Sequence, residues 1–132
     1  MKLRIKGNSI RLRLMQGEVN DLNEKGLVKE ITEFGLSEDQ RFIYSIFKDE
    51  NSKEISASLN TNQIQIKLPS RMVSNWAESD QVGIQHQISI TDNISLDLLI
   101  EKDFKCLTVR ENEDESDAFP NPLEEHPKEG NC

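Results

Sequence analysis

Polar and apolar residues alternate over the first fourteen positions of the chain. The apolar residues occupy every second position in 2–6 and again in 9–14, which is the pattern of two strands that each bury one face. Gly7 and Asn8 between them suit a two-residue hairpin turn, because both residue types tolerate a positive φ. The sequence therefore predicts an opening β-hairpin.

The turn sets the register of this hairpin: Lys6 faces Ser9, Arg4 faces Arg11 and Lys2 faces Arg13. One face is then aliphatic. The other carries the five cations of the first 13 positions, Lys2, Arg4, Lys6, Arg11 and Arg13. Like charges directly opposite each other destabilise a sheet by up to about 1 kcal/mol per pair. We therefore expect something to compensate this basic surface.

Beyond the hairpin, the pattern predicts a small α+β domain. Apolar residues recur at helical spacing in 16–25 and 70–79. Strands are indicated over 27–34, 41–48, 54–60, 62–68, 83–90 and 94–102, with a last short strand over 104–109. We expect a mostly antiparallel meander that forms a curled sheet or a small barrel, without an internal repeat.

The regular pattern stops before the last 22 residues, 111–132, which hold eight acids and three prolines and almost no aliphatic side chains. Such a segment cannot bury enough apolar surface to order itself. We therefore divide the chain into one domain, 1–110, and an acidic, flexible or loosely docked tail, 111–132. Phe119, followed by Pro120, is the tail residue suited to an apolar groove of its own domain or of a partner.

The net charge of −8 is unevenly distributed along the 132 residues. Residues 1–15 carry +5 and residues 111–132 carry −7, which leaves −6 on the rest. The acidic balance argues against nucleic acid as a partner. No apolar run approaches the roughly 20 residues that cross a bilayer, and the first residues lack the apolar core of a signal peptide. We expect a cytoplasmic protein without membrane contact, and its oligomeric state stays open.

No catalytic or cofactor motif is recognisable in the sequence. It has no Gly-rich phosphate loop, nucleophile elbow or metal-binding His-Glu pair, so we expect no cofactor. Cys106, His126 and Cys132 are the candidates for a zinc site. Their spacing is irregular and no Cys-x-x-Cys occurs, so a small buried side chain and a free thiol are the simpler interpretation for the cysteines. His86 is in phase with apolar neighbours, which is typical of a core or rim residue.

Three explanations of the basic surface remain open. In the first, solvent and acids elsewhere in the fold neutralise the surface. In the second, the acidic tail lies across the surface. In the third, the surface binds an anionic small molecule or an acidic protein segment, since arginine pairs bidentately with phosphate and carboxylate. The third explanation describes a small binding or regulatory module whose tail modulates access. Its alternatives are an enzyme that acts on a phosphorylated small molecule and a structural domain without a ligand.

Four stretches, RIKGNSIRLRL, TEFG, EKDFKCL and EDESDAFPNP, resemble a family of short, uncharacterised bacterial proteins, a domain of unknown function. The resemblance covers most of the chain and implies a stand-alone bacterial cytoplasmic domain with no assigned activity. The alternating cations are also similar to those of triphosphate-tunnel enzymes, which line an antiparallel barrel with Arg and Lys. In this sequence RIK stands where those enzymes have a Glu-x-Glu-x-Lys metal-binding signature.

Overall fold

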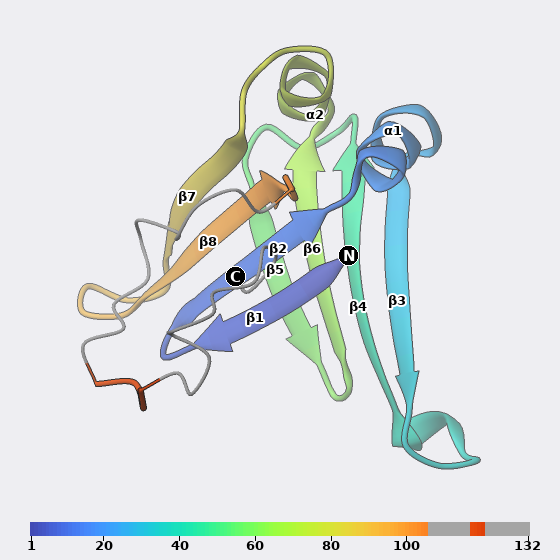
Figure 1. Ribbon diagram of the computed structural model, residues 1–132, viewed down its shortest axis with the longest axis vertical. Coiled ribbons are helices and arrows are strands. Elements are labelled where there is room, and N and C mark those ends of the chain that lie inside the picture. The colour runs from blue at the N-terminus through green and yellow to red at the C-terminus, as the bar shows by residue number, and fades with distance from the viewer. Residues whose placement is uncertain (106–116, 121–132) are drawn as a thin grey trace.

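The computed structural model describes residues 1–105 and 117–120 (Figure 1). Its elements are, in chain order, β1 (Lys2–Lys6), β2 (Ser9–Leu14), α1 (Gln16–Lys25), β3 (Leu27–Glu33), the 3-10 helix η1 (Glu38–Gln40), β4 (Arg41–Asp49), β5 (Ser56–Asn60), β6 (Gln63–Pro69), α2 (Ser70–Ala77), β7 (Gly83–Ser89) and β8 (Ser95–Lys102). The predicted helices and strands up to residue 102 are confirmed to within two residues at each end. The predicted strand 104–109 is not, because Phe104 and Lys105 are outside any strand and 106–109 lie outside the described residues.

The strands form two four-stranded sheets that face each other (Figure 1). Sheet A has the order β1-β2-β8-β7 and sheet B the order β3-β4-β6-β5. The α+β class is confirmed, and most strand pairs are antiparallel. The predicted meander is wrong, because β2 pairs in parallel with β8 and β4 with β6, which are not consecutive strands. Of the two predicted forms of the sheet, the curled sheet fits and the barrel does not, since within residues 1–105 neither sheet closes on itself.

The two halves of the fold are copies of one ββαββ unit, β1 to β4 and β5 to β8. Adding 54 to a residue number in the first unit gives its counterpart in the second, and 56 in the case of β3 and β7. Arg4 pairs with Arg11, and their counterparts Ser58 and Gln65 also pair. Both hairpin turns contain one residue in the left-handed region, Gly7 at φ 54° and its counterpart Thr61 at φ 52°. The expectation of no internal repeat is therefore wrong.

The repeat escapes a reading of the sequence because most counterparts outside the core differ in residue type, and only the buried positions are alike. Buried pairs are Leu12 and Ile66, Leu14 and Leu68, Val19 and Val73, Leu22 and Trp76, and Ile46 and Ile100. A core position demands an apolar side chain of suitable volume and tolerates several residue types. The duplication is therefore visible in the registers of the paired strands and not in the overall sequence identity.

The two units exchange hairpins to build the sheets. Sheet A joins the first hairpin of the first unit, β1–β2, to the second hairpin of the second unit, β7–β8. Sheet B joins the two remaining hairpins in the same way. The helices α1 and α2 contact each other and cover one common end of both sheets (Figure 1). Neither unit can complete a sheet alone.

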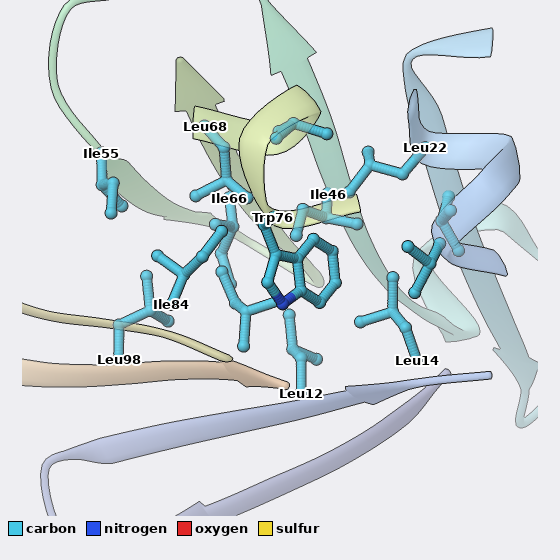
Figure 2. Close-up of a cluster of buried hydrophobic side chains, with 14 of the residues drawn as sticks. Leu12, Leu14, Leu22, Ile46, Ile55, Ile66, Leu68, Trp76, Ile84 and Leu98 are labelled. Carbon is cyan, nitrogen blue, oxygen red and sulfur yellow. The ribbon is translucent and has the colours of Figure 1, made fainter. Parts of the chain in front are cut away.

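The core lies between the sheets, beneath the helices (Figure 2). Trp76 of α2 is fully buried at its centre, with Leu12 and Leu14 of β2 on one side and Ile46 of β4 on the other. The indole Nε1 of Trp76 donates a hydrogen bond of 3.1 Å to the carbonyl oxygen of Val82. One side chain of the second unit therefore holds both sheets and the start of β7 together.

Cutting the linker between the units, residues 50–54, is expected to leave the two halves bound to each other, because each sheet contains one hairpin from each half. Asn51 and Lys53 are exposed, so a protease site fits there. After cleavage, size-exclusion chromatography in native buffer should show one species at the elution volume of the uncut 15.2 kDa chain. In denaturant two fragments should appear. Separation of the halves in native buffer would contradict the exchange of hairpins.

Candidate functional site: the basic face of sheet A

The five cations of the first hairpin lie on the outward side of sheet A. The register predicted from the turn is confirmed at all five residue pairs of the hairpin. Successive side chains of a strand point to opposite faces. Because Leu12 and Leu14 point into the core, Arg11 and Arg13 point away from it, and so do the β1 cations, which hold register positions on the same face. We call the surface formed by these cations the basic face: Lys2, Arg4, Lys6, Arg11 and Arg13.

Acidic residues of the second unit reach the basic face through β8. This strand runs parallel to β2, and the register places Asp97 beside Ser9 and Glu101 beside Arg13. Asp103 follows directly after β8. Among the described residues of β1, β2 and β8 and the one that follows β8, five cations of the first unit therefore adjoin three acids of the second.

Glu101 lies between two arginines. Its Oε1 accepts hydrogen bonds from Nε of Arg11 and Nε of Arg13, both at 2.8 Å, and Nη2 of Arg11 is 2.7 Å from the same oxygen. The side chains are largely shielded from solvent, at 18% exposure for Arg11, 15% for Arg13 and 14% for Glu101. Hydrogen bonds between charged groups are the stronger ones. They hold both guanidinium groups in place without a ligand.

The cations of β1 are more exposed than those of β2. The Nζ of Lys2 is 3.1 Å from Oδ2 of Asp103, and the lysine side chain is 73% exposed. Exposed ion pairs of this kind contribute at most about 1 kcal/mol. Arg4 and Lys6 are both exposed. The carbonyl oxygen of Lys6 accepts a hydrogen bond of 2.6 Å from the hydroxyl of Ser9, which tightens the turn.

These contacts bear on the three explanations of the basic surface. Acids elsewhere in the fold compensate Arg11, Arg13 and Lys2, as the first explanation holds. The second explanation, in which the acidic tail lies across the basic face, concerns residues 111–132, of which the structure describes only 117–120. The cations line no tunnel in the part of the chain that the structure describes, since they lie on the outward face of an open sheet.

Sheet B shows that the fold does not need the cations. The counterparts of the five basic residues in the second unit are Ser56, Ser58, Asn60, Gln65 and Lys67. Phe47 stands in the place of Glu101. The second hairpin keeps the same register and helix connection with mostly neutral side chains. The charges of the basic face therefore distinguish the two units and are not part of their shared scaffold.

A second polar cluster anchors the start of β1 to sheet B. The ammonium group of Met1 donates to carboxylates of Glu18 and, at 2.9 Å, Glu30, and the hydroxyl of Tyr44 donates to the Met1 carbonyl oxygen at 2.8 Å. Burial lowers the pKa of this ammonium, but the hydrogen bonds and charges of the two carboxylates outweigh it and raise the pKa above 8.0. Burial, followed by the charges of Glu30 and Glu18, raises the pKa of the Tyr44 phenol. The ammonium thus stays charged at neutral pH and ties the basic hairpin to α1 and β3, while the Met1 carbonyl oxygen ties it to β4.

The remaining candidates from the sequence are three possible zinc ligands and one histidine. The zinc candidates Cys106, His126 and Cys132 lie outside the described residues. In residues 1–105 and 117–120, no three His, Cys, Asp or Glu side chains gather as metal ligands would. His86 is exposed and pairs in register with Leu98, at the rim of sheet A. Over the same ranges, no helix has the length and apolar character needed to cross a membrane.

Sequence reasoning did not identify Glu101 and Asp103 as parts of this site. Their strand joins β2 by parallel pairing, and β2 and β8 are separated by almost the whole domain. The available signal was the spacing of Asp97, Glu101 and Asp103 at even intervals, which puts the three acids on one face of a strand.

Comparisons with known proteins add a family to this picture. A family model described as a family of unknown function, DUF7009, matches residues 1–123, which include both ββαββ units. Comparison with curated proteins and with solved structures gives no match. The family match agrees with the resemblance of the four sequence stretches to a domain of unknown function. The chain belongs to the DUF7009 family of unknown function.

Proposed function

We propose that this protein is a small cytoplasmic binding or regulatory module whose basic face binds an anionic ligand. The contrast between the two units carries the proposal. Identical scaffold positions hold five cations in sheet A and mostly neutral residues in sheet B. Acids of the second unit compensate several of these cations, but the second unit has the same scaffold without them, so a role in binding accounts for their presence.

The geometry of the hairpin suits an oxyanion. Arg4 and Arg11 are directly opposite each other, and side chains at such positions start about 5 Å apart. A phosphate or carboxylate above them can accept hydrogen bonds from both guanidinium groups. Because Arg11 is already held by Glu101, less side-chain entropy is lost on binding. The ligand class that fits is a phosphate or carboxylate, on a small molecule or on an acidic protein segment.

The acidic tail supplies the regulatory part of the proposal. Residues 111–132 carry −7 and the first 15 residues carry +5. A covalently attached segment of opposite charge competes with a free anion at a high effective concentration. Deletion of 111–132 is therefore expected to raise the affinity for anions, and an unchanged affinity would remove the tail from the proposal.

Binding of tripolyphosphate, measured by isothermal titration calorimetry, tests the anion site itself. The variant Lys2→Ser/Arg4→Ser/Lys6→Asn gives the three basic positions of β1 the residues of their counterparts in β5. We expect it to bind at least about tenfold more weakly, because hydrogen bonds to charged groups contribute about 1.5–3 kcal/mol each. Binding to the unchanged chain should also weaken as salt rises from 50 to 500 mM, roughly the range over which exposed charges become screened.

A matched control removes three exposed lysines elsewhere, Lys25→Ser/Lys29→Ser/Lys53→Ser. Its net charge change is the same, so any loss due to overall charge alone appears in both variants. We expect the control to bind within about twofold of the unchanged chain, since Lys25, Lys29 and Lys53 lie off the basic face. Equal losses in both variants would contradict a localised anion site.

A further inference from the structure

An apolar cleft of about 300 Å³ opens between the sheets, at the hairpin turns. The equivalent first hairpins of both units form most of its wall. The aliphatic part of the lining is Ile5, Ile10, Ala57, Leu59, Ile64 and Leu96. The helices cover the other end of the sheets (Figure 1), where Trp76 fills the space between them (Figure 2). The turn end has no such filling side chain among its lining residues.

The mouth of the cleft is formed by two large aliphatic side chains. Ile5 is 54% exposed and Leu59 is 69% exposed, and they are counterparts in the two units. Leu59 lines the cleft, and its side chain is in contact with solvent there. Ile64 forms a deeper part of the wall and is 7% exposed. Clefts of this size with aliphatic walls are typical of small-molecule sites.

The cleft and the basic face meet at one strand. Ile5 stands between Arg4 and Lys6 in β1, so its side chain faces the cleft and those of its neighbours face outward. β1 is the first strand in the order of sheet A, with no further strand beside it in the described part of the chain. A ligand can therefore reach around the free edge of β1, with one end in the cleft and the other on the cations.

We propose that the ligand of this protein is an amphipathic anion, a single free molecule with an alkyl or aromatic body in the cleft and a phosphate or carboxylate on Arg4 and Lys6. This inference rests on the proposed function and names its ligand class. A water molecule takes about 30 Å³, so the cleft holds roughly ten groups of that size. This room suits one medium-length chain.

Octyl phosphate, ethyl phosphate and octanol, titrated below the micellar concentration of the longer phosphate, separate the two parts of the site. Each buried methylene strengthens binding about fourfold. We expect octyl phosphate to bind at least about 100-fold more tightly than ethyl phosphate, and octanol to bind more weakly than octyl phosphate. Competition with tripolyphosphate is expected for octyl phosphate, since the two share the cations of β1.

The variant Leu59→Gln tests the cleft without touching the basic face. We expect it to weaken octyl phosphate binding at least about tenfold and to leave ethyl phosphate binding unchanged. The control Ile31→Gln makes the same exchange at a residue of β3 that is 45% exposed and outside the cleft. It should bind both phosphates like the unchanged chain.

Each other outcome overturns the inference in a different way. If tripolyphosphate binds but octyl phosphate binds no more tightly than ethyl phosphate, the proposed anion site is supported and the amphipathic ligand is contradicted. If octanol binds as tightly as octyl phosphate, the cleft binds apolar molecules independently of the cations. Phe119 is 98% exposed in the structure. If the unchanged chain does not bind octyl phosphate and the variant Phe119→Ser does, the cleft is the binding site of the Phe119 side chain instead of a ligand. If no phosphate binds at all, the proposed function fails as well.

Discussion

Replacing Trp76 with alanine is expected to lower the free energy of unfolding by about 3–5 kcal/mol, the usual cost of truncating a large aromatic side chain in a core. Trp76 is fully buried and contacts residues from both sheets (Figure 2). The change also removes the indole N–H, which donates a hydrogen bond of 3.1 Å to the carbonyl oxygen of Val82. Since small domains are stable by about 5–15 kcal/mol, the variant should be close to unfolding at room temperature. Urea denaturation followed by far-UV circular dichroism measures the loss, because the chain has no other tryptophan for fluorescence.

Two companion variants make this prediction specific. Trp76→Leu gives α2 the residue of its counterpart Leu22, and it should cost less than Trp76→Ala because a smaller cavity remains. Leu36→Ala removes an apolar side chain that is fully exposed, and its effect should stay within about 0.5 kcal/mol. A loss below about 1 kcal/mol for Trp76→Ala would contradict a core that depends on this side chain.

Replacing Glu101 with glutamine is expected to lower the free energy of unfolding by about 1–3 kcal/mol. The change removes the negative charge that Arg11 and Arg13 share through one oxygen. Both arginines have less than a fifth of their side chains exposed, so solvent screens their mutual repulsion only in part. The same change should raise the affinity for tripolyphosphate severalfold, because the basic face gains one net positive charge. Urea denaturation and calorimetry measure the two effects.

Glu33→Gln is the matched control for the Glu101 variant. The Oε1 of Glu33 is 3.5 Å from Nε of Arg41, and the Glu33 side chain is 64% exposed. Exposed pairs contribute little, so we expect a change in stability of less than about 0.5 kcal/mol and no change in anion affinity. If Glu101→Gln behaves like this control in both measurements, Glu101 neither stabilises the basic face nor competes with its ligand.

The opening hairpin is the part of this protein that sequence reasoning predicted best, because its determinants are local. Alternation decides which side chains share a face, and the Gly7-Asn8 turn decides the register. The end of α1 is another example. A glycine directly after the last helical residue is a typical C-cap, and Gly26 adopts φ 82° while its N–H donates to the carbonyl oxygens of Asp21 and Leu22. Each of these features depends on neighbours within a few residues.

The non-local features were predicted poorly. Period-two alternation in β2 shows that one side of the strand is buried, but it does not show which strand lies beside it. The parallel pairing of β2 with β8, which brings Glu101 between Arg11 and Arg13, comes from the exchange of hairpins between the units. The cleft has the same origin, since its walls come from hairpins of both units.

The sequence by itself determined the elements, the α+β class and the common side on which Lys2, Arg4, Lys6, Arg11 and Arg13 emerge. These follow from backbone geometry and from the burial of apolar residues along a single strand or helix. Only the tertiary structure decided that two units interlock, that Glu101 holds two of the arginines, and that a cleft opens beside Ile5. Those features depend on which surfaces meet, and many apolar faces of similar size can satisfy each other, so the packing of the whole chain selects among them.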